Sequence, residues 1–331
     1  MTNQAAYGEV SEVNWQLEST TLHGTLVIPF GSGPFPAAVM VAGSGPTNRD
    51  WISPLLPGTN GSARLMAEAL ARAGIASLRY DKLASDPHIR EHLQALIGKF
   101  SMQSHLDELT GAVRTLAGYN SIQAGRIFAL TNSEGALHAL NYQLHSPTLK
   151  FAGLVLTAPP GRTVGAVAHS QVAAQLGGLP NGNEMLATYD AAIARFVAGE
   201  PVAPEPALPQ SVQMVLQGLT SPVNLPFARE LWTADVAAML RHVTVPMLII
   251  IGKKDLQVDW QADGEPLQRA AEGLKDVTFL FPEDANHVLK HESKPRSQLV
   301  ASEVTVSYNA PDAQLDPDLQ SSILKWLAAH A

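Results

Sequence analysis

The sequence lacks cysteine altogether, with none among its 331 residues. Disulfide bonds, thiolate metal sites and a cysteine nucleophile are therefore excluded. The absence does not identify a cellular compartment, since a chain without cysteine folds equally well in an oxidising or a reducing environment.

Long apolar runs and an excess of basic residues are also lacking. The apolar runs have the length of a strand, as at 245–251, whereas a membrane-spanning helix needs about 20 apolar residues. Residues 1–10 show neither the basic nor the apolar region of a signal peptide. With 22 Lys and Arg against 30 Asp and Glu, the formal charge is −8, which argues against nucleic acid or an anionic membrane as a partner. We expect a soluble, cytoplasmic protein; secretion after removal of a signal peptide and assembly as a homodimer stay open.

The first half of the chain alternates between strand and helix patterns. Two strands that flank a short turn, at 10–17 and 21–28, predict an antiparallel hairpin. Predicted strands follow at 37–41, 75–79, 126–130 and 151–157, and predicted helices at 62–73, 101–117 and 135–144. Residues 82–99 show no regular pattern. This alternation predicts an α/β fold with a mostly parallel, doubly wound sheet and the hairpin at one edge.

The alternation is then interrupted by a helical segment. Pro-rich breaks separate predicted helices at 165–176, 183–198, 210–216 and 227–240. Strands return at 245–251 and 277–281, with helices at 260–272 and 318–329. We therefore predict one core domain, made of residues 1–158 and 244–331, with an inserted helical cap at 159–243.

A strand runs directly into a helix around Ser133. Gly135 follows two residues later, as in the nucleophile elbow G-x-S-x-G, where a sharp turn raises a serine hydroxyl above the sheet. Thr131 stands where the first glycine is usual. The alternative for Ser133 is an ordinary helix N-cap, a position that serine favours.

Two further residues follow strand ends in an order that fits the elbow. Asp255 lies just past the strand at 245–251, and His287 lies in the loop after the strand at 277–281. Catalytic groups of open α/β sheets gather at the carboxyl ends of strands, and Ser, Asp, His is the order that accompanies this kind of elbow. The alternatives are that Asp255 is an ordinary turn residue and that His287 is a solvated loop residue. Asp259 is the second candidate for the acid.

A glycine-rich loop, Ala-Gly-Ser-Gly-Pro at 42–46, follows the strand at 37–41. Such a loop supplies one backbone N–H to an oxyanion hole, and the residue after the nucleophile supplies the other. The expected donors are the N–H groups of Ser44 and Glu134. A plain Gly-Pro turn is the alternative.

Together these features resemble the α/β-hydrolase family from about residue 20 to the C-terminus, and they imply the α/β-hydrolase fold. The sequence is most similar to a bacterial esterase and acyl-peptidase-like branch, in which HGSGP is followed by an Arg-Asp pair and later by RYDKRG. The corresponding segments are 42–46, Asn-Arg-Asp at 48–50 and Arg-Tyr-Asp-Lys at 79–82. Ala42 replaces the usual histidine of the first segment. Leu83 replaces the arginine after Lys82, so we expect a rebuilt loop at 83–100 that lines the substrate pocket.

The resemblance implies hydrolysis of a small-molecule carboxylic ester through an acyl-enzyme. Ser133 would be the nucleophile, His287 the base and Asp255 the acid that orients the base, with no metal or organic cofactor. The same residues would serve a peptidase, a thioesterase or a lactone hydrolase, and a non-catalytic ligand-binding member of the fold is the remaining alternative.

Two histidine pairs have the i, i+4 spacing that can bind zinc on a helix. They are His88 with His92 and His287 with His291. In neither pair does a glutamate directly follow the first histidine, as the zinc-hydrolase motif H-E-x-x-H needs. We therefore predict no metal site.

Overall fold

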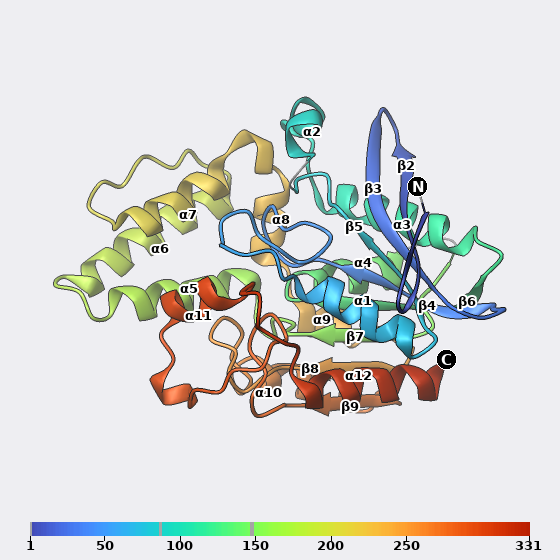
Figure 1. Cartoon of the computed structure of the whole chain (residues 1–331). Coiled ribbons are helices and arrows are strands. Elements are labelled where there is room, and N and C mark those ends of the chain that lie inside the picture. Colours follow the sequence, from blue (N-terminus) through green and yellow to red (C-terminus); the bar gives the residue numbers. More distant parts are fainter. Residues whose placement is uncertain (1, 86–87, 146–148) are drawn as a thin grey trace.

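A mostly parallel sheet runs through the structure, a computed structural model that describes residues 2–85, 88–145 and 149–331 (Figure 1). Within these ranges the sheet has nine strands in the order β1-β2-β3-β5-β4-β6-β7-β8-β9. The strands are β1 (Thr2–Ala5), β2 (Gly8–Leu17), β3 (Thr20–Pro29), β4 (Phe35–Val41), β5 (Ala76–Tyr80), β6 (Ile122–Asn132), β7 (Leu154–Thr157), β8 (Met247–Ile250) and β9 (Val277–Leu280). β1, β2, β3 and β5 pair antiparallel, and all later pairings are parallel. The predicted hairpin and parallel sheet are confirmed.

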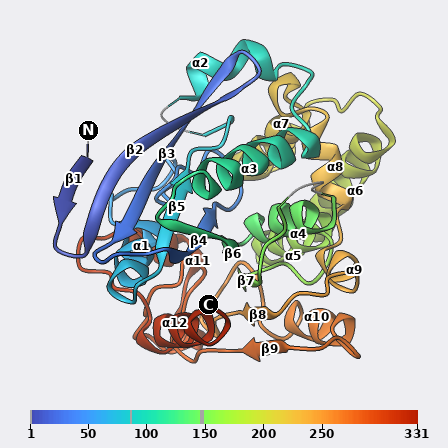
Figure 2. The ribbon, with the colours of Figure 1, turned by 90° about the vertical axis from the view of Figure 1, so that its right-hand side faces the viewer.

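Helices cover both faces of this sheet (Figure 2). One face packs on α1 (Ser62–Arg72) and α12 (Pro317–His330), and the other packs on α3 (Met102–Ala117), α4 (Gly135–His145), α9 (Val236–Leu240) and α10 (Gly264–Ala270). The central strands β4 and β8 are buried on both sides, so their sequences are continuously apolar instead of alternating. This double burial makes the strand ends the natural place for polar, reactive side chains.

Helices α5 (Val164–Leu176), α6 (Gly182–Ala198), α7 (Gln210–Thr220) and α8 (Phe227–Thr233) lie in the chain between β7 and β8. Figure 1 shows α5, α6 and α7 extending away from the sheet. Their apolar faces form a cluster of their own, in which Tyr189 and Phe196 are buried. The short 3-10 helix η1 (Pro222–Asn224) precedes α8.

The single helix predicted at 227–240 is wrong, because two helices occupy this range. α8 ends at Thr233, and the Asp235 carboxylate then accepts the N–H of Ala238 at 2.9 Å, which caps a new helix, α9. α9 turns back to the main core, where Val236 and Leu240 are buried. The break therefore marks the point at which the chain returns from the α5–α8 cluster to the sheet.

Two helices occur where the sequence pattern indicated none. Part of the segment expected to be irregular, 82–99, forms α2 (Ile89–Leu96), and α11 (Ala301–Ser307) follows the 3-10 helix η2 (Arg296–Gln298). Both helices are short, and α11 buries Val304 alone. Such helices depend on tertiary packing more than on their own sequence pattern. Among the described residues, no helix has both the length and the apolar character needed to cross a membrane.

Candidate active site

Ser133 occupies the sharp turn between β6 and α4. Its φ of 55° lies in the left-handed region, which costs an L-residue energy and recurs at functional sites. The turn is held by the Ser133 N–H, which donates to the Thr157 carbonyl at 2.9 Å. A Cβ at Gly135 would lie 2.5 Å from the Val41 carbonyl oxygen, so only glycine fits where α4 begins. The local sequence thus forces Ser133 into a strained, half-buried position at the strand end.

Thr131 does not disturb this turn. It is fully buried in β6, and its backbone carbonyl accepts the Thr157 hydroxyl at 2.5 Å. The side chain thus fits against β7, the next strand in the sheet.

Asp255 and His287 meet beside the turn, although 32 residues separate them in the sequence. His287 Nδ1 lies 2.8 Å from Asp255 Oδ2, and both side chains are buried. The other oxygen, Asp255 Oδ1, accepts the N–H groups of Gln257 at 2.7 Å and Val258 at 2.9 Å. The Asn132 side chain donates to the His287 carbonyl at 2.9 Å and so ties the histidine loop to the end of β6.

Asp259 faces a different partner. Its carboxylate lies 2.8 Å from Arg296 Nη2 and accepts the N–H groups of Gln261 and Ala262, both at 2.9 Å. These bonds belong to the turn that precedes α10, which explains why the helix predicted from residue 260 begins only at Gly264.

The glycine-rich loop after β4 lies against the Ser133 turn. A Cβ at Gly43 would be 3.2 Å from both the Asn132 carbonyl oxygen and Ser133 Cβ. Within the described part of the chain, the N–H groups of Ser44 and Glu134 donate to no protein acceptor. Both groups are therefore free to bind an oxygen atom of a ligand.

The motif segment after β4, at 48–50, and the one at the end of β5, at 79–82, are paired crosswise. Arg49 donates from its backbone N–H and from Nε to the Asp81 carboxylate, at 2.7 and 2.8 Å. Arg79 Nε lies 3.1 Å from Asp50 Oδ1. In the sequence these segments stand out only by resemblance. The structure gives the physical reason, because each arginine neutralises the aspartate of the other segment and fixes the residues after the glycine-rich loop to the end of β5.

Ser133 and His287 line the same cavity, which has a volume of about 390 Å³. Its walls come from the glycine-rich loop and the residues after it, from the histidine loop, and from α11 with the residues that follow; they include Trp51, Leu55, Leu56, Gln257, Val288, Thr305, Tyr308 and Asn309. Among the residues that the structure describes, none that lines this cavity carries a carboxylate, an ammonium or a guanidinium group. The cavity therefore suits an uncharged ligand.

The prediction that residues 83–100 line this cavity is wrong for the part of that segment that the structure describes. Leu83, Leu96 and Phe100 instead pack with Leu22 and Phe227 in a separate apolar cluster. Burial of these apolar side chains draws the segment toward β3 and α8. Instead of this segment, α11, which the sequence pattern did not indicate, forms part of the cavity wall.

A group of buried titratable side chains lies behind the turn. His105 Nδ1 is 2.9 Å from Glu108 Oε2, His138 Nε2 is 3.0 Å from Glu134 Oε1, and the two imidazole rings are 4.0 Å apart. Lys82 Nζ, also buried, donates to the Gly43 carbonyl at 2.5 Å. Burial alone would raise the pKa of Glu134, but the His138 hydrogen bond and the charge of Lys82 outweigh it and lower that pKa to about 2.

Burial also acts on His138, whose neutral form it favours. Burial and the neighbouring His105 lower the pKa of His138 to about 4, although the carboxylate of Glu134 acts to raise that pKa. His105, Glu134 and His138 each offer a ligand atom within 4.8 Å of the others, as do His23, His88 and Glu91. His105 and His138 each pair one ring nitrogen with a carboxylate, whereas His105 Nε2 and His138 Nδ1 are buried without a hydrogen-bond partner among the described residues. Lys82 supplies positive charge beside Glu134.

The two histidine pairs picked out by their i, i+4 spacing do not converge on one point. His92 Nδ1 lies 3.1 Å from the Leu83 carbonyl oxygen, and His88 stacks on His23 with ring centroids 3.9 Å apart. His287 faces Asp255, whereas His291 faces Asp316 at 3.3 Å.

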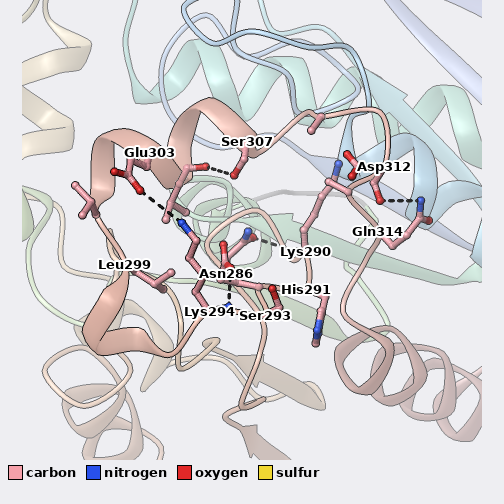
Figure 3. Close-up of a pocket in the computed structure, with 15 residues that line it drawn as sticks. Asn286, Lys290, His291, Ser293, Lys294, Leu299, Glu303, Ser307, Asp312 and Gln314 are labelled. Atoms are coloured by element: carbon pink, nitrogen blue, oxygen red, sulfur yellow. Dashed lines mark hydrogen bonds and ion pairs between the residues drawn. The ribbon is translucent and has the colours of Figure 1, made fainter.

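A second cavity, of about 420 Å³, lies next to α11 and is shown in Figure 3. Its lining includes charged residues, among them Lys294 and Glu303, which pair at 3.6 Å. Glu303, Val304 and Ser307 face this cavity, whereas Thr305 lines the cavity of Ser133. α11 thus contributes to the walls of both cavities, and Ser133 and His287 belong to the uncharged one.

The strand order, the serine turn at the carboxyl end of β6 and the loops after β8 and β9 are those of the α/β-hydrolase fold, and the chain has that fold. No protein-family model matches the chain. Esterase EstD of Thermotoga maritima is 28% identical to it over 270 residues, which are 81% of this chain and 58% of that protein. The chain thus spans little more than half the length of this relative.

Solved structures share the fold over almost the whole chain. An esterase from Pyrococcus furiosus has a TM-score of 0.56 at 16% identity, covering 97% of this chain and 91% of that one. A proline iminopeptidase from Mycobacterium smegmatis has a TM-score of 0.56 at 17% identity, covering 97% and 98%. A dienelactone hydrolase from Anabaena variabilis has a TM-score of 0.53 at 17% identity, covering 98% of each chain. At these identities the likeness establishes the fold alone.

Proposed function

We propose that this protein is a serine hydrolase that cleaves carboxylic esters through an acyl-enzyme intermediate. One observation carries the proposal: Ser133, in a strained turn, lines the same uncharged cavity as His287, whose Nδ1 lies 2.8 Å from a buried aspartate. The similarity to an esterase over 81% of the chain supports the same chemistry.

In this mechanism, His287 Nε2 takes the Ser133 proton while Ser133 Oγ attacks the ester carbonyl carbon. The resulting tetrahedral intermediate carries its negative charge on the former carbonyl oxygen. The free N–H groups of Ser44 and Glu134 would stabilise that oxyanion. The protonated His287 then donates to the leaving alcohol, and a water molecule repeats the sequence to release the acid.

Asp255 is the proposed acid of the triad. Its Oδ2 contacts His287 Nδ1, and two backbone N–H groups hold Oδ1, so the carboxylate is fixed in place. From this position it would keep the Nδ1–H tautomer and stabilise the imidazolium. Asp259 is engaged with Arg296 instead.

The lining of the cavity favours a neutral ester over a peptide substrate. A peptidase that recognises a free amino terminus needs a carboxylate to bind the ammonium group, and no acidic residue in the described part of the chain lines the cavity. Apolar side chains such as Trp51, Leu55 and Leu56 suit a small or medium acyl chain. Thioester and lactone hydrolysis use the same groups and stay as alternatives.

We also propose that residues 159–243 act as a cap over the core domain of residues 1–158 and 244–331. The separate apolar cluster of α5–α8 supports this division. The Gln171 side chain of α5 donates at 3.0 Å to the carbonyl of Gln257, a residue of the cavity wall, and so links the proposed cap to the site. The cytoplasmic location and the homodimer stay untested expectations from the sequence.

A series of p-nitrophenyl esters with acyl chains of increasing length tests the proposed function. We expect turnover by the wild type, none by Ser133→Ala, and labelling of Ser133 by a fluorophosphonate, located by mass spectrometry. Amino-acid p-nitroanilides should react far more slowly than the esters. Absence of both turnover and labelling would overturn the enzyme proposal in favour of a ligand-binding role.

A further inference from the structure

Lys82 is a buried lysine with one direct partner among the described residues. Its Nζ donates to the Gly43 carbonyl at 2.5 Å, and the residue is 2% exposed. Burying an ammonium group is costly unless it is paired and hydrogen-bonded. The carboxylates of Glu134 and Glu108 favour its charged form from a greater distance. Packing alone does not explain why an ammonium group is buried here with a single backbone carbonyl as its hydrogen-bond partner.

The geometry of the peptide bond gives that reason. The Gly43 carbonyl and the Ser44 N–H belong to one planar trans unit and point in opposite directions. A hydrogen bond that fixes the direction of the carbonyl therefore fixes the direction of the N–H as well. Gly43 and Ser44 line the cavity, whereas Lys82 does not. With the carbonyl turned toward Lys82, the N–H points away from it.

We propose that Lys82 is a positioning residue for the oxyanion hole: it locks the Gly43–Ser44 peptide so that the Ser44 N–H faces the substrate carbonyl. This inference rests on the proposed function. Its chemical basis is a charge-assisted hydrogen bond, which orients the peptide and also polarises it, making the N–H a stronger donor.

The loop needs such a lock because its glycines leave the backbone free to rotate. Gly43 has no side chain to restrict it, and Gly45 adopts a φ of 72°, in the region that glycine favours. If the Gly43–Ser44 peptide flipped, its carbonyl oxygen would face the oxyanion and repel it. Lys82 opposes this flip by holding the carbonyl on the far side.

Lys82 also connects the two halves of the proposed oxyanion hole. On one side it bonds the peptide that carries the Ser44 N–H. On the other, it attracts the carboxylate of Glu134, whose backbone N–H is the second donor. Asp81, the residue before it, is held by Arg49 of the segment after β4. Two consecutive residues of the Arg-Tyr-Asp-Lys segment thus brace the glycine-rich loop and the residues that follow it.

Lys82→Met tests the inference, because methionine keeps much of the side chain's length and apolar character but cannot donate. The matched control is Lys290→Met, which removes another buried lysine that donates to a backbone carbonyl, that of Asn60. We expect Lys82→Met to lower kcat for a p-nitrophenyl ester by about 10²-fold or more, as loss of one oxyanion donor does, with KM changed less than about 3-fold. Lys290→Met should keep kcat within about 3-fold of the wild type.

An inhibitor pair distinguishes positioning from general structural damage. A trifluoromethyl ketone adds to the serine and places an oxyanion in the hole, whereas the matching alcohol cannot. Lys82→Met should weaken ketone binding by about the factor lost in kcat and leave alcohol binding unchanged. Equal effects on both ligands, or an equal kcat loss in Lys290→Met, would overturn the inference.

Failure of the proposed function gives a different result. If the wild type neither hydrolyses the esters nor reacts with a fluorophosphonate, the hydrolase proposal fails and this inference fails with it. If the wild type does both, and Lys82→Met matches it in kcat and in labelling rate, only the inference is overturned.

Discussion

His287 Nδ1 lies 2.8 Å from Asp255 Oδ2, while Asp259, four residues further along the chain, pairs with Arg296. The contact couples a loop after β8 to a loop after β9, and both residues are buried. Asp255 and Asp259 look alike in the sequence, but they have different partners in the structure. Substitution of each aspartate should therefore affect catalysis to a different extent.

Asp255→Asn should reduce kcat/KM by about 10⁴-fold, because an asparagine at this position favours the wrong imidazole tautomer. Asp259→Asn is the matched control and should change kcat/KM less than about 3-fold, since its carboxylate bonds Arg296 and a turn. Steady-state kinetics on a p-nitrophenyl ester measures both. The larger loss in Asp259→Asn would reverse the assignment of the acid.

Ser133→Ala and Ser133→Gly should both abolish turnover but differ in stability. The left-handed φ of 55° strains any residue with a Cβ, whereas glycine adopts it freely. We expect Ser133→Gly to have a free energy of unfolding about 1 kcal/mol higher than that of Ser133→Ala. Urea denaturation of the two variants checks this. A glycine variant no more stable than the alanine variant would mean that the turn is not strained.

Gly135→Ala should damage both stability and catalysis. The added Cβ would lie 2.5 Å from the Val41 carbonyl oxygen and push α4 away from β4, at a cost of about 1–3 kcal/mol in the free energy of unfolding. Gly218→Ala, at an exposed helical glycine with no atom within 4 Å of its would-be Cβ, is the control and should stabilise by about 0.5–1 kcal/mol. Similar unfolding free energies for the two variants would contradict the close packing at the turn.

Acid should destabilise the protein through the buried group behind the turn. The pKa of His138 is about 4 in the folded state, below the ordinary value of 6.5, so between these pH values only the unfolded chain binds the proton. Stability therefore falls as the pH drops. Glu134, with a pKa lowered to about 2, acts in the same direction below pH 4.5.

The comparison of wild type with His138→Gln isolates the histidine in this acid response. Between pH 6.5 and 4.5 the free energy of unfolding of the wild type should fall by about 2 kcal/mol more than that of the variant. Denaturant titrations at a series of pH values measure the difference. Parallel curves for the two proteins would show that His138 binds its proton equally in the folded and the unfolded states.

Much of the architecture follows from local sequence patterns. The alternation of apolar strands with amphipathic helices predicts the parallel sheet, and strands buried on both faces are easily recognised because they are continuously apolar. Short elements are harder to predict. α11 buries one apolar residue, Val304, so its sequence carries almost no periodic signal, yet it forms part of the cavity wall.

By itself, the sequence determined the fold class and the positions after strand ends at which the candidate catalytic side chains occur. Ser133, Asp255 and His287 each follow a predicted strand, and that placement depends only on local pattern. Tertiary structure alone decided which aspartate faces His287, that Lys82 bonds the Gly43 carbonyl, and that the described residues of the segment 83–100 do not line the cavity. The physical reason is that these contacts join segments distant in sequence, and their partners are selected by the burial of apolar surface and the pairing of charge across the whole fold.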